Sequence, residues 1–191
     1  MVELKPVALE KVYRLFNVGG TALVSAAHDG KTDVMPATWV CPLNTEPSRV
    51  TACVDAPHYT RPLIEKSGYF ALALPTVQIA KETLYLGSVS KNDEPEKLEK
   101  SGAKFFTMDG WDIPFVEGCA CYVIYKVLPE AHIAEAYDLF VGEAVAAWAD
   151  PRVFEDGHWK FETAPKELST LHYVAGGRFY TIGAPLDVTL D

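Results

Sequence analysis

The dipeptide Asp29-Gly30 lies between two strand-like runs, Thr21 to Ala27 and Thr32 to Cys41. Asp-Gly supplies the two positive-φ positions that a tight two-residue turn requires, so it is a strong signal for a β-hairpin. A hairpin with apolar strands must bury one face against further structure. The chain is therefore constrained toward folds built around an antiparallel sheet.

Further short apolar runs follow this hairpin, with turn residues between them. They predict strands over residues 50–54, 69–74, 118–128 and 132–147, the last being a bent strand or a pair of strands. Residues 171–182 are predicted to close the chain around Gly176-Gly177. Several short strands with turn signals between them are typical of a barrel or sandwich, so we predict a mainly β fold.

Short helices complete the predicted elements. Residues 6–16 form a helix or a lead-in, and a helix over 61–67 has Pro62 in its first turn and Gly68 as its stop. Thr76 is predicted to cap a helix that runs to about Leu86 and stops at Gly87. A capping-box-like start at Asp93 opens a helix that ends at Gly102. Residues 150–168 are expected to form a surface excursion.

Size and charge limit the classes of function. The 191 residues are expected to form one domain over 1–191. With 17 basic and 26 acidic residues the net charge is −9, which excludes a general nucleic-acid binder, since phosphate neutralisation needs a basic face. The first residues lack the apolar core of a secretory signal, and the uncharged run over 67–80 is too short to span a bilayer. We expect a soluble, cytoplasmic protein without membrane contact.

Motifs for the common catalytic mechanisms are missing. The chain has no GxSxG elbow, P-loop, HExxH or GxGxxG, and its five histidines are scattered. The four cysteines form no CxxC pair, and we expect free buried thiols, with Cys119 and Cys121 on one strand face. No catalytic residue and no metal site are predicted. Any enzymatic chemistry would come from a bound cofactor.

Three segments have the composition of a site for an anionic aromatic cofactor. Residues 57–62 lead from a strand into a helix, where free amides, Thr60 and the positive charge of Arg61 or His58 attract phosphate. Residues 87–91 combine glycine, two serines and a lysine. In residues 35–39, Pro36 implies a strand edge or bulge, and Trp39 can cover an aromatic ring.

Each segment also has a plainer interpretation. Thr60 can be a helix cap, residues 87–91 can be a solvated connection, and Trp39 can be a core residue beside an edge proline. The segments become informative through their order along the chain. Together they resemble the flavin reductase-like family, especially its flavoredoxin branch, from about residue 15 to residue 185. The matching parts are the hairpin at Asp29-Gly30 and the segments 35–39, 59–60, 70–72, 87–91, 93–97, 138–143 and 176–180.

The resemblance implies a split β-barrel that binds FMN, with a few short helices, usually as a homodimer with the flavin near the interface. Carried over by position, one group of residues would line the isoalloxazine: Met35, Pro36, Ala37, Thr38 and Trp39. A second would surround the phosphate and ribityl chain: His58, Tyr59, Thr60 and Arg61. Ser88, Ser90 and Lys91 would close the other side. Ala73 stands where the family often has Asn, which removes a polar contact.

The expected activity is that of an NAD(P)H:flavin oxidoreductase. A nicotinamide would stack on the flavin and pass hydride to N5, and the electrons would go on to oxygen, iron, free flavin or a redox protein partner. Three alternatives remain open from the sequence. They are an FMN electron carrier reduced by a partner protein, a non-catalytic barrel that binds flavin or haem, and an unrelated β-barrel. The sequence does not distinguish NADH from NADPH.

Overall fold

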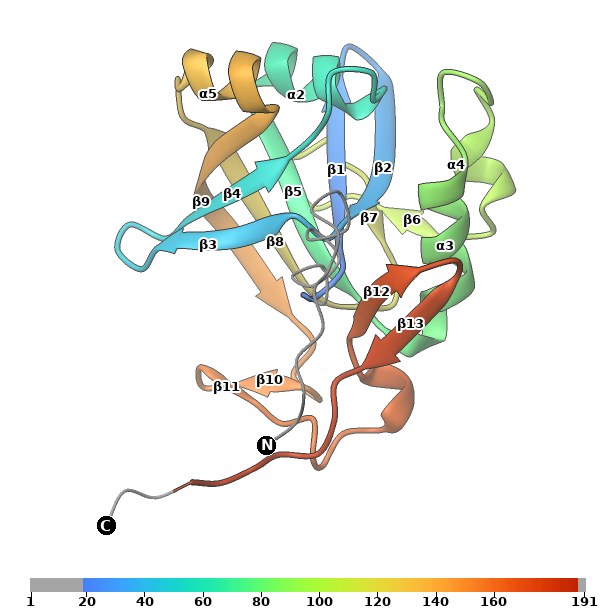
Figure 1. Ribbon diagram of the computed structural model, residues 1–191, viewed down its shortest axis with the longest axis vertical. Helices are drawn as coiled ribbons and strands as arrows, with labels where there is room; N and C mark the ends of the chain where they lie inside the picture. Colours follow the sequence, from blue (N-terminus) through green and yellow to red (C-terminus); the bar gives the residue numbers. More distant parts are fainter. Residues whose placement is uncertain (1–18, 189–191) are drawn as a thin grey trace, which may run out of the picture.

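The computed structural model describes residues 19–188, and the predicted helix over 6–16 lies outside them. Figure 1 shows a curled antiparallel sheet with short helices around it. Its seven strands have the order β2-β1-β5-β8-β9-β4-β3. Their bounds are β1 Ala22–His28, β2 Lys31–Ala37, β3 Val40–Asn44, β4 Arg49–Cys53, β5 Tyr69–Pro75, β8 Cys119–Val127 and β9 Leu139–Ala149.

The chain connectivity requires this sheet to curl. Strands β2 and β3 stand at opposite ends of the strand order, yet only Thr38 and Trp39 separate them in sequence. A link this short spans only about 10 Å, so the two edges of the sheet must approach each other. The backbone amide of Cys53 donates to the carbonyl of Trp39 at 3.0 Å and holds the link against β4. The predicted mainly β architecture with a few short helices is confirmed.

The first hairpin forms as predicted, but its second strand is shorter. Asp29 and Gly30 both have positive φ, 50° and 71°, and β1 pairs with β2 from His28↔Lys31 to Ala22↔Ala37. The predicted strand over 32–41 was wrong in its length. It breaks after Ala37, because β2 ends at one edge of the sheet and β3 begins at the other.

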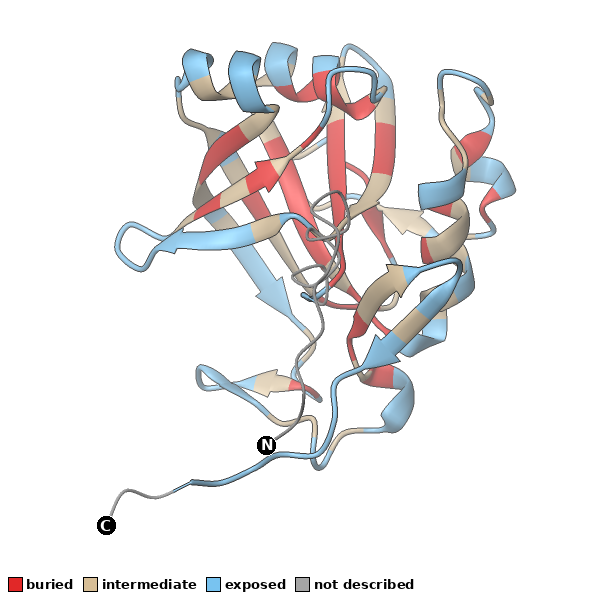
Figure 2. Cartoon of the chain, in the orientation of Figure 1, coloured by how far each residue is buried: buried red, intermediate tan, exposed pale blue. Residues whose placement is uncertain are grey.

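The interior of the curled sheet holds the main core. Figure 2 shows buried residues concentrated on the central strands and the inner face of the helix above them. Phe70 on β5 is fully buried and stacks on Tyr125 of β8, with ring centroids 5.4 Å apart. Gly142 on β9 faces this pair, and a Cβ there would lie 2.7 Å from the Phe70 ring. Any side chain at position 142 would therefore push β9 away from the core.

The helix predicted over 61–67 is confirmed as α2, Thr60–Ser67, and ends at Gly68 with φ 72°. The helix predicted over 76–86 is a 3-10 turn, η2 Val77–Ile79, followed by α3, Ala80–Ser88. Two details were wrong. The Thr76 hydroxyl does not cap the helix but donates to the carbonyl of Gly118 at 2.7 Å. Gly87 lies inside α3 rather than ending it.

Two other helical predictions also differ from the structure. The segment from Asp93 to Gly102 forms only one turn of helix, α4 Lys97–Lys100, and no side chain caps it. Residues 132–147 are not all strand, because α5, Ala131–Tyr137, precedes β9. Asp138, with φ 56°, ends α5 and turns the chain into the strand. The mixed polar and alanine-rich composition of residues 131–137 suits a surface helix better than a buried strand.

The remaining strands form three two-stranded sheets at the periphery. They pair β6 Phe105–Phe106 with β7 Phe115–Val116, β10 Phe154–Glu155 with β11 His158–Trp159, and β12 Leu171–Ala175 with β13 Arg178–Thr181. The last pair confirms the predicted closure around Gly176-Gly177. The excursion over 150–168 includes η3, Lys166–Leu168, and is not only surface. Val153 and Leu168 are buried against Ala120 of β8.

The four cysteines are free thiols, but the prediction that they are buried holds only in part. Cys119 is buried, Cys53 and Cys121 are half-buried, and Cys41 is exposed on β3. Burial raises the pKa of the Cys121 thiol to about 11 and raises that of Cys119 as well. Across residues 19–188, no helix has the length and apolar character needed to cross a membrane.

Candidate functional site

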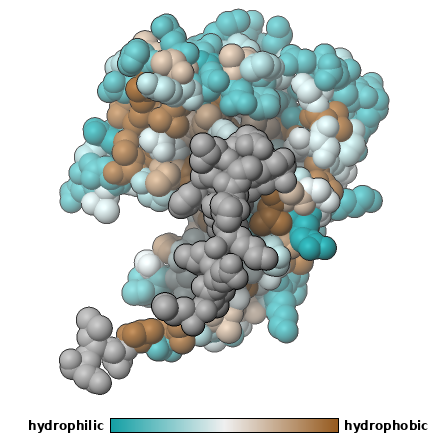
Figure 3. Space-filling view, in the orientation of Figure 1, coloured by the Kyte–Doolittle hydropathy of each residue, from teal (hydrophilic) through white to brown (hydrophobic). Residues whose placement is uncertain are grey.

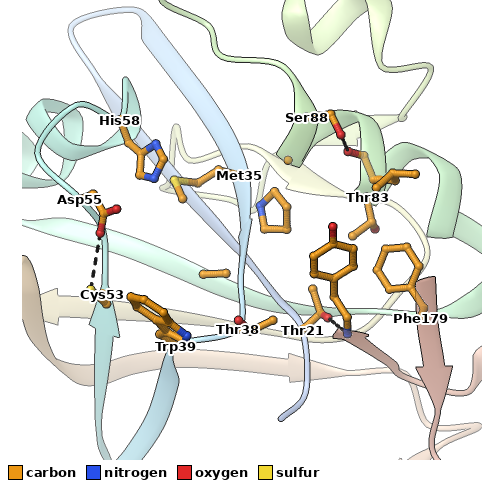
Figure 4. Close-up of a pocket in the computed structure, with 15 residues that line it drawn as sticks. Thr21, Met35, Thr38, Trp39, Cys53, Asp55, His58, Thr83, Ser88 and Phe179 are labelled. Atoms are coloured by element: carbon orange, nitrogen blue, oxygen red, sulfur yellow. Dashed lines mark hydrogen bonds between the residues drawn. The ribbon is translucent and has the colours of Figure 1, made fainter. Parts of the chain in front are cut away.

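A cavity of about 280 Å³ opens between four parts of the chain: β2, the loop that follows β4, helix α3 and the β12–β13 hairpin (Figure 4). Its lining comes from distant parts of the sequence. The lining residues are Thr21, Met35, Pro36, Ala37, Thr38, Trp39, Cys53, Asp55, His58, Thr83, Leu84, Gly87, Ser88, Tyr173 and Phe179.

One wall of the cavity is the end of β2 and the link that follows it. Met35, Pro36, Ala37, Thr38 and Trp39, all predicted to line a flat ring, lie together here. Trp39 is 54% exposed, so it is not the core tryptophan of the alternative interpretation. At this point β2 is an edge strand of the sheet. An edge strand leaves backbone donors and acceptors available to a ligand.

The polar end of the cavity follows β4. Cys53, Asp55 and His58 lie there, on the side of Figure 4 opposite Phe179. The Cys53 thiol donates to an Asp55 carboxylate oxygen at 3.7 Å and lies equally far from the carbonyl of Tyr137. Burial, followed by the negative charge of Asp55, raises the pKa of Cys53. The cavity therefore presents a neutral thiol at neutral pH.

Helix α3 forms the wall that adjoins β2. A Cβ on Gly87 would lie 2.6 Å from Cγ of Pro36, so glycine is what allows α3 to pack directly on β2. Ser88, predicted as a ligand contact, lines the cavity, and its hydroxyl donates to the carbonyl of Leu84 at 2.8 Å. Thr83 lies one turn earlier on the helix and also lines the cavity.

The far wall comes from the C-terminal hairpin. Tyr173 on β12 and Phe179 on β13 face each other, with ring centroids 5.1 Å apart. The hairpin is fixed to the start of β1, because the amide of Tyr173 donates to the Thr21 hydroxyl at 3.0 Å. Thr21, Thr83, Tyr173 and Phe179 were not predicted from the sequence as site residues. The resemblance over 176–180 includes Phe179, and the segment 87–91 begins on the same helix as Thr83.

In the segment predicted to surround the phosphate, residues 58–61, Thr60 is bonded within the protein and does not face the cavity. Thr60 is fully buried and does not line the cavity, and its hydroxyl donates to Asp33 of β2 at 2.7 Å. Thr60 is not the helix cap either, since Tyr59 holds that position. The other oxygen of Asp33 accepts from Lys97 at 3.0 Å in a buried ion pair. Burial lowers the pKa of Lys97, and Asp33 offsets part of that effect.

Arg61 is also used within the fold. Its guanidinium donates to the carbonyls of Val54 at 3.0 Å and Ala134 at 2.7 Å, to Glu65 at 2.8 Å, and to Asp138. These bonds join α2 to the end of β4 and to α5. The side chain is buried and is absent from the cavity lining. As the structure stands, the donors of Arg61 are directed at protein acceptors rather than at a ligand.

Tyr59, Ser90 and Lys91 do not line the cavity. The Ser90 hydroxyl accepts from the amide of Asn92 at 3.2 Å. The Lys91 ammonium donates to the carbonyl of Thr32 at 2.5 Å and lies 5.5 Å from the centre of the Tyr59 ring. An ammonium has three donors, so this contact leaves Lys91 able to bind an anion.

Comparison with known proteins gives this cavity a context. The sequence over residues 15–181 matches the protein family described as the flavin reductase like domain. An FMN-binding domain of a flavin reductases-like enzyme from Shewanella baltica has 44% identity and a TM-score of 0.87, with 96% of each chain covered. The uncharacterized protein YddH of Escherichia coli is 36% identical over 93% of this chain and 94% of its own.

A flavoredoxin from Methanosarcina acetivorans shares the fold, with a TM-score of 0.74 at 23% identity over 99% of this chain and 96% of that one. The predicted split-barrel architecture is thus found in solved relatives. The domain match covers most of the sequence, and it includes the strand, helix and hairpin that line the cavity. This chain belongs to the flavin reductase-like family of FMN-binding proteins.

Proposed function

We propose that this protein binds FMN in the cavity beside β2 and accepts hydride from NAD(P)H. The observation that carries the proposal is the wall of residues 35–39, whose members line one cavity as the family resemblance predicts for an isoalloxazine. An apolar wall with a few polar groups is the usual form of a cofactor site. When bound, FMN supplies the chemistry of accepting hydride and passing electrons on.

The residues present fit such a group. Met35, Pro36 and Trp39 give the ring an apolar and aromatic surface. His58 and Ser88 line the cavity on either side of β2 (Figure 4), and Lys91, whose ammonium donates to the Thr32 carbonyl of β2, would supply the positive charge for the phosphate.

The work of the protein in this proposal is positioning. Residues 35–39 would hold the ring against β2, and fixing it for stacking with a second ring would remove much of the entropic barrier to hydride transfer. Backbone groups at the β2 edge would stabilise negative charge on the reduced ring. The neutral thiol of Cys53 adds no charge to this surface. No side chain is required as a general acid.

The test begins with the spectrum of purified protein after loading with FMN and desalting. We expect a retained flavin spectrum that bleaches on anaerobic mixing with NADH or NADPH. Lys91→Gln should weaken FMN binding about tenfold and leave riboflavin binding unchanged, because only FMN has a phosphate. Lys66→Gln, at an exposed position on α2, is the matched control. Failure to retain flavin, or equal effects on FMN and riboflavin, would contradict the proposal.

A second candidate is an FMN electron carrier that a partner protein reduces. The net charge of −9 favours it, since an acidic surface suits docking to a basic redox partner. Stopped-flow mixing separates the two functions. Slow or absent bleaching with both nicotinamides, together with rapid reduction by a flavoprotein reductase, would favour the carrier. In either case we place the reaction in the cytoplasm.

We also propose a homodimer. Leu43 on β3 and Val145 and Trp148 on β9 are exposed apolar residues, and Figure 3 shows apolar side chains gathered on this side of the molecule. The pairing of β9 with β4 runs only over 139–143, and among residues 19–188 no strand pairs with the rest of that β9 edge. Free edges and apolar patches of this kind favour association. Sedimentation should give twice the monomer mass, and Trp148→Glu should give monomers.

A further inference from the structure

Thr83 carries a buried hydroxyl that the fold leaves unpaired. The residue is 1% exposed on α3, and its Oγ1 has no hydrogen-bond partner among residues 19–188. Leaving a buried hydroxyl unpaired costs stability, so such groups are rare and call for an explanation. Because Thr83 also lines the cavity, the explanation we consider is a ligand.

Other buried threonines show how the fold normally treats this group. The Thr60 hydroxyl donates to Asp33 at 2.7 Å, and the Thr76 hydroxyl donates to the carbonyl of Gly118 at 2.7 Å. Thr83 differs from them in its contact with the cavity. Threonine in a helix divides between two χ1 rotamers. Rotation about χ1 therefore exchanges the positions of its methyl and hydroxyl groups, which gives the hydroxyl a second direction in which to find a partner.

The cavity lining on the side of Thr83 is aromatic and uncharged. Tyr173 and Phe179 pack with their rings 5.1 Å apart, and Leu84 completes this corner of the cavity. A Cβ on Gly177, at the tip of their hairpin, would lie 3.5 Å from Leu84, so the hairpin rests on α3. Figure 4 shows Thr83 and Phe179 together on one side of the cavity, with Asp55 and His58 on the other.

We propose that Thr83, Tyr173 and Phe179 form a subsite for a flat, uncharged conjugated ring that carries a carbonyl group. Aromatic faces bind such a ring by stacking, and the hydroxyl donates a hydrogen bond to its carbonyl oxygen. The inference rests on the proposed function, in which a second ring must lie against the flavin. That ring is either the nicotinamide of the donor, through its carboxamide, or a carbonyl-bearing organic acceptor.

The corner is separate from the residues that resemblance assigns to the flavin ring. Those residues lie on β2 and its link to β3, whereas α3 and the C-terminal hairpin build the corner. The proposal therefore predicts that loss of the Thr83 hydroxyl affects the second ligand more than FMN. It also predicts that loss of this hydroxyl stabilises the ligand-free protein, since an unpaired buried hydroxyl lowers the free energy of unfolding.

The test compares Thr83→Val with Thr83→Ser, which keeps the hydroxyl, and with Thr76→Val as a control at a paired buried threonine. We expect Thr83→Val to raise the Tm of apoprotein by about 2–4 °C, and Thr76→Val to lower it. Binding to FMN-loaded protein is measured with two probes, tetrahydro-NAD, which cannot donate hydride, and benzaldehyde. Thr83→Val should weaken at least one about 5- to 30-fold, with FMN binding changed less than about twofold. Thr83→Ser should restore binding.

Weakening of tetrahydro-NAD alone assigns the corner to the donor, and weakening of benzaldehyde alone assigns it to an acceptor. Unchanged binding of both probes overturns the inference. A fall in apoprotein Tm also overturns it, since the hydroxyl would then be structural, as does weakened FMN binding with unaffected probes. If wild-type protein retains no FMN, the proposed function fails by that result alone. Apoprotein Tm values and benzaldehyde binding to apoprotein then still decide the role of Thr83.

Discussion

The two segments that resemblance assigns to the cofactor, residues 35–39 and residues 58–61, are used differently by the fold. All members of the first line the cavity, whereas only His58 of the second does so. Thr60 and Arg61 are buried and bonded to protein groups. A polar or charged side chain near a site is therefore available to a ligand only if its hydrogen bonds are not already made within the fold.

Among substitutions in these two segments, Arg61→Ala is expected to have the largest effect on stability. It removes a buried cation and leaves the carbonyls of Val54 and Ala134 without their donor. We expect a loss of about 3 kcal/mol in the free energy of unfolding, measured by urea denaturation of apoprotein. FMN affinity of the folded protein should change less than twofold. Arg61→Lys keeps the charge but not the geometry of the guanidinium, and it should remain destabilised.

The comparison would fail if Arg61→Ala stayed stable and lost FMN affinity tenfold or more. Rescue of that affinity by Arg61→Lys would then assign the charge to the phosphate, as the sequence analysis first predicted. Either result is measured on folded protein, at a temperature well below the unfolding transition of each variant.

A smaller effect is expected from Thr60→Ala. The change removes one hydrogen bond to Asp33, which keeps its ion pair with Lys97. Apoprotein should lose about 1–2 kcal/mol of stability, the cost of one broken bond to a buried charge. FMN affinity should stay within twofold, and Thr60→Ser should behave as wild type. A weakened FMN complex with unchanged apoprotein stability would return Thr60 to the phosphate site.

Local sequence signals predicted the parts of the fold that short-range physics decides. Asp29-Gly30 and Gly68 adopt the positive φ values that glycine and aspartate favour, so the hairpin and the end of α2 appeared where expected. Gly87 was wrongly predicted as a helix stop, because glycine is needed at this position for a long-range contact, the close approach of α3 to Pro36. No pattern within ten residues of position 87 reports that contact.

The candidate site divides in the same way. The wall of residues 35–39 is one continuous segment, so a sequence motif can describe it completely. Thr83, Tyr173 and Phe179 come from elements that meet only when the chain is folded. Their contacts depend on how the C-terminal hairpin packs on α3, which sequence spacing does not specify. Likewise, the pairing of Asp33 with Thr60 and Lys97 joins three separate elements.

The smallest expected effect concerns the boundary between the two segments, where Cys53 lines the cavity. Its raised pKa, caused by burial and by Asp55, leaves less thiolate at a given pH than an ordinary thiol has, and Cys53 is also less exposed than Cys41. Thiolate is the reactive form, so iodoacetamide should modify Cys53 more slowly than Cys41 at pH 8. The rate at Cys53 should rise with pH through and above 9.0, the ordinary value of the thiol.

The effect of FMN on the alkylation rate of Cys53 tests where the flavin ring binds. A ring bound against Trp39 would cover Cys53, whose amide donates to the Trp39 carbonyl, and would leave Cys41 open to the reagent. FMN should therefore slow alkylation of Cys53 several-fold with no change at Cys41, as followed by mass spectrometry of the two peptides. Equal protection of both thiols would indicate association rather than cofactor binding. Absence of protection at Cys53 in FMN-loaded protein would place the ring toward α3 and away from the polar end of the cavity.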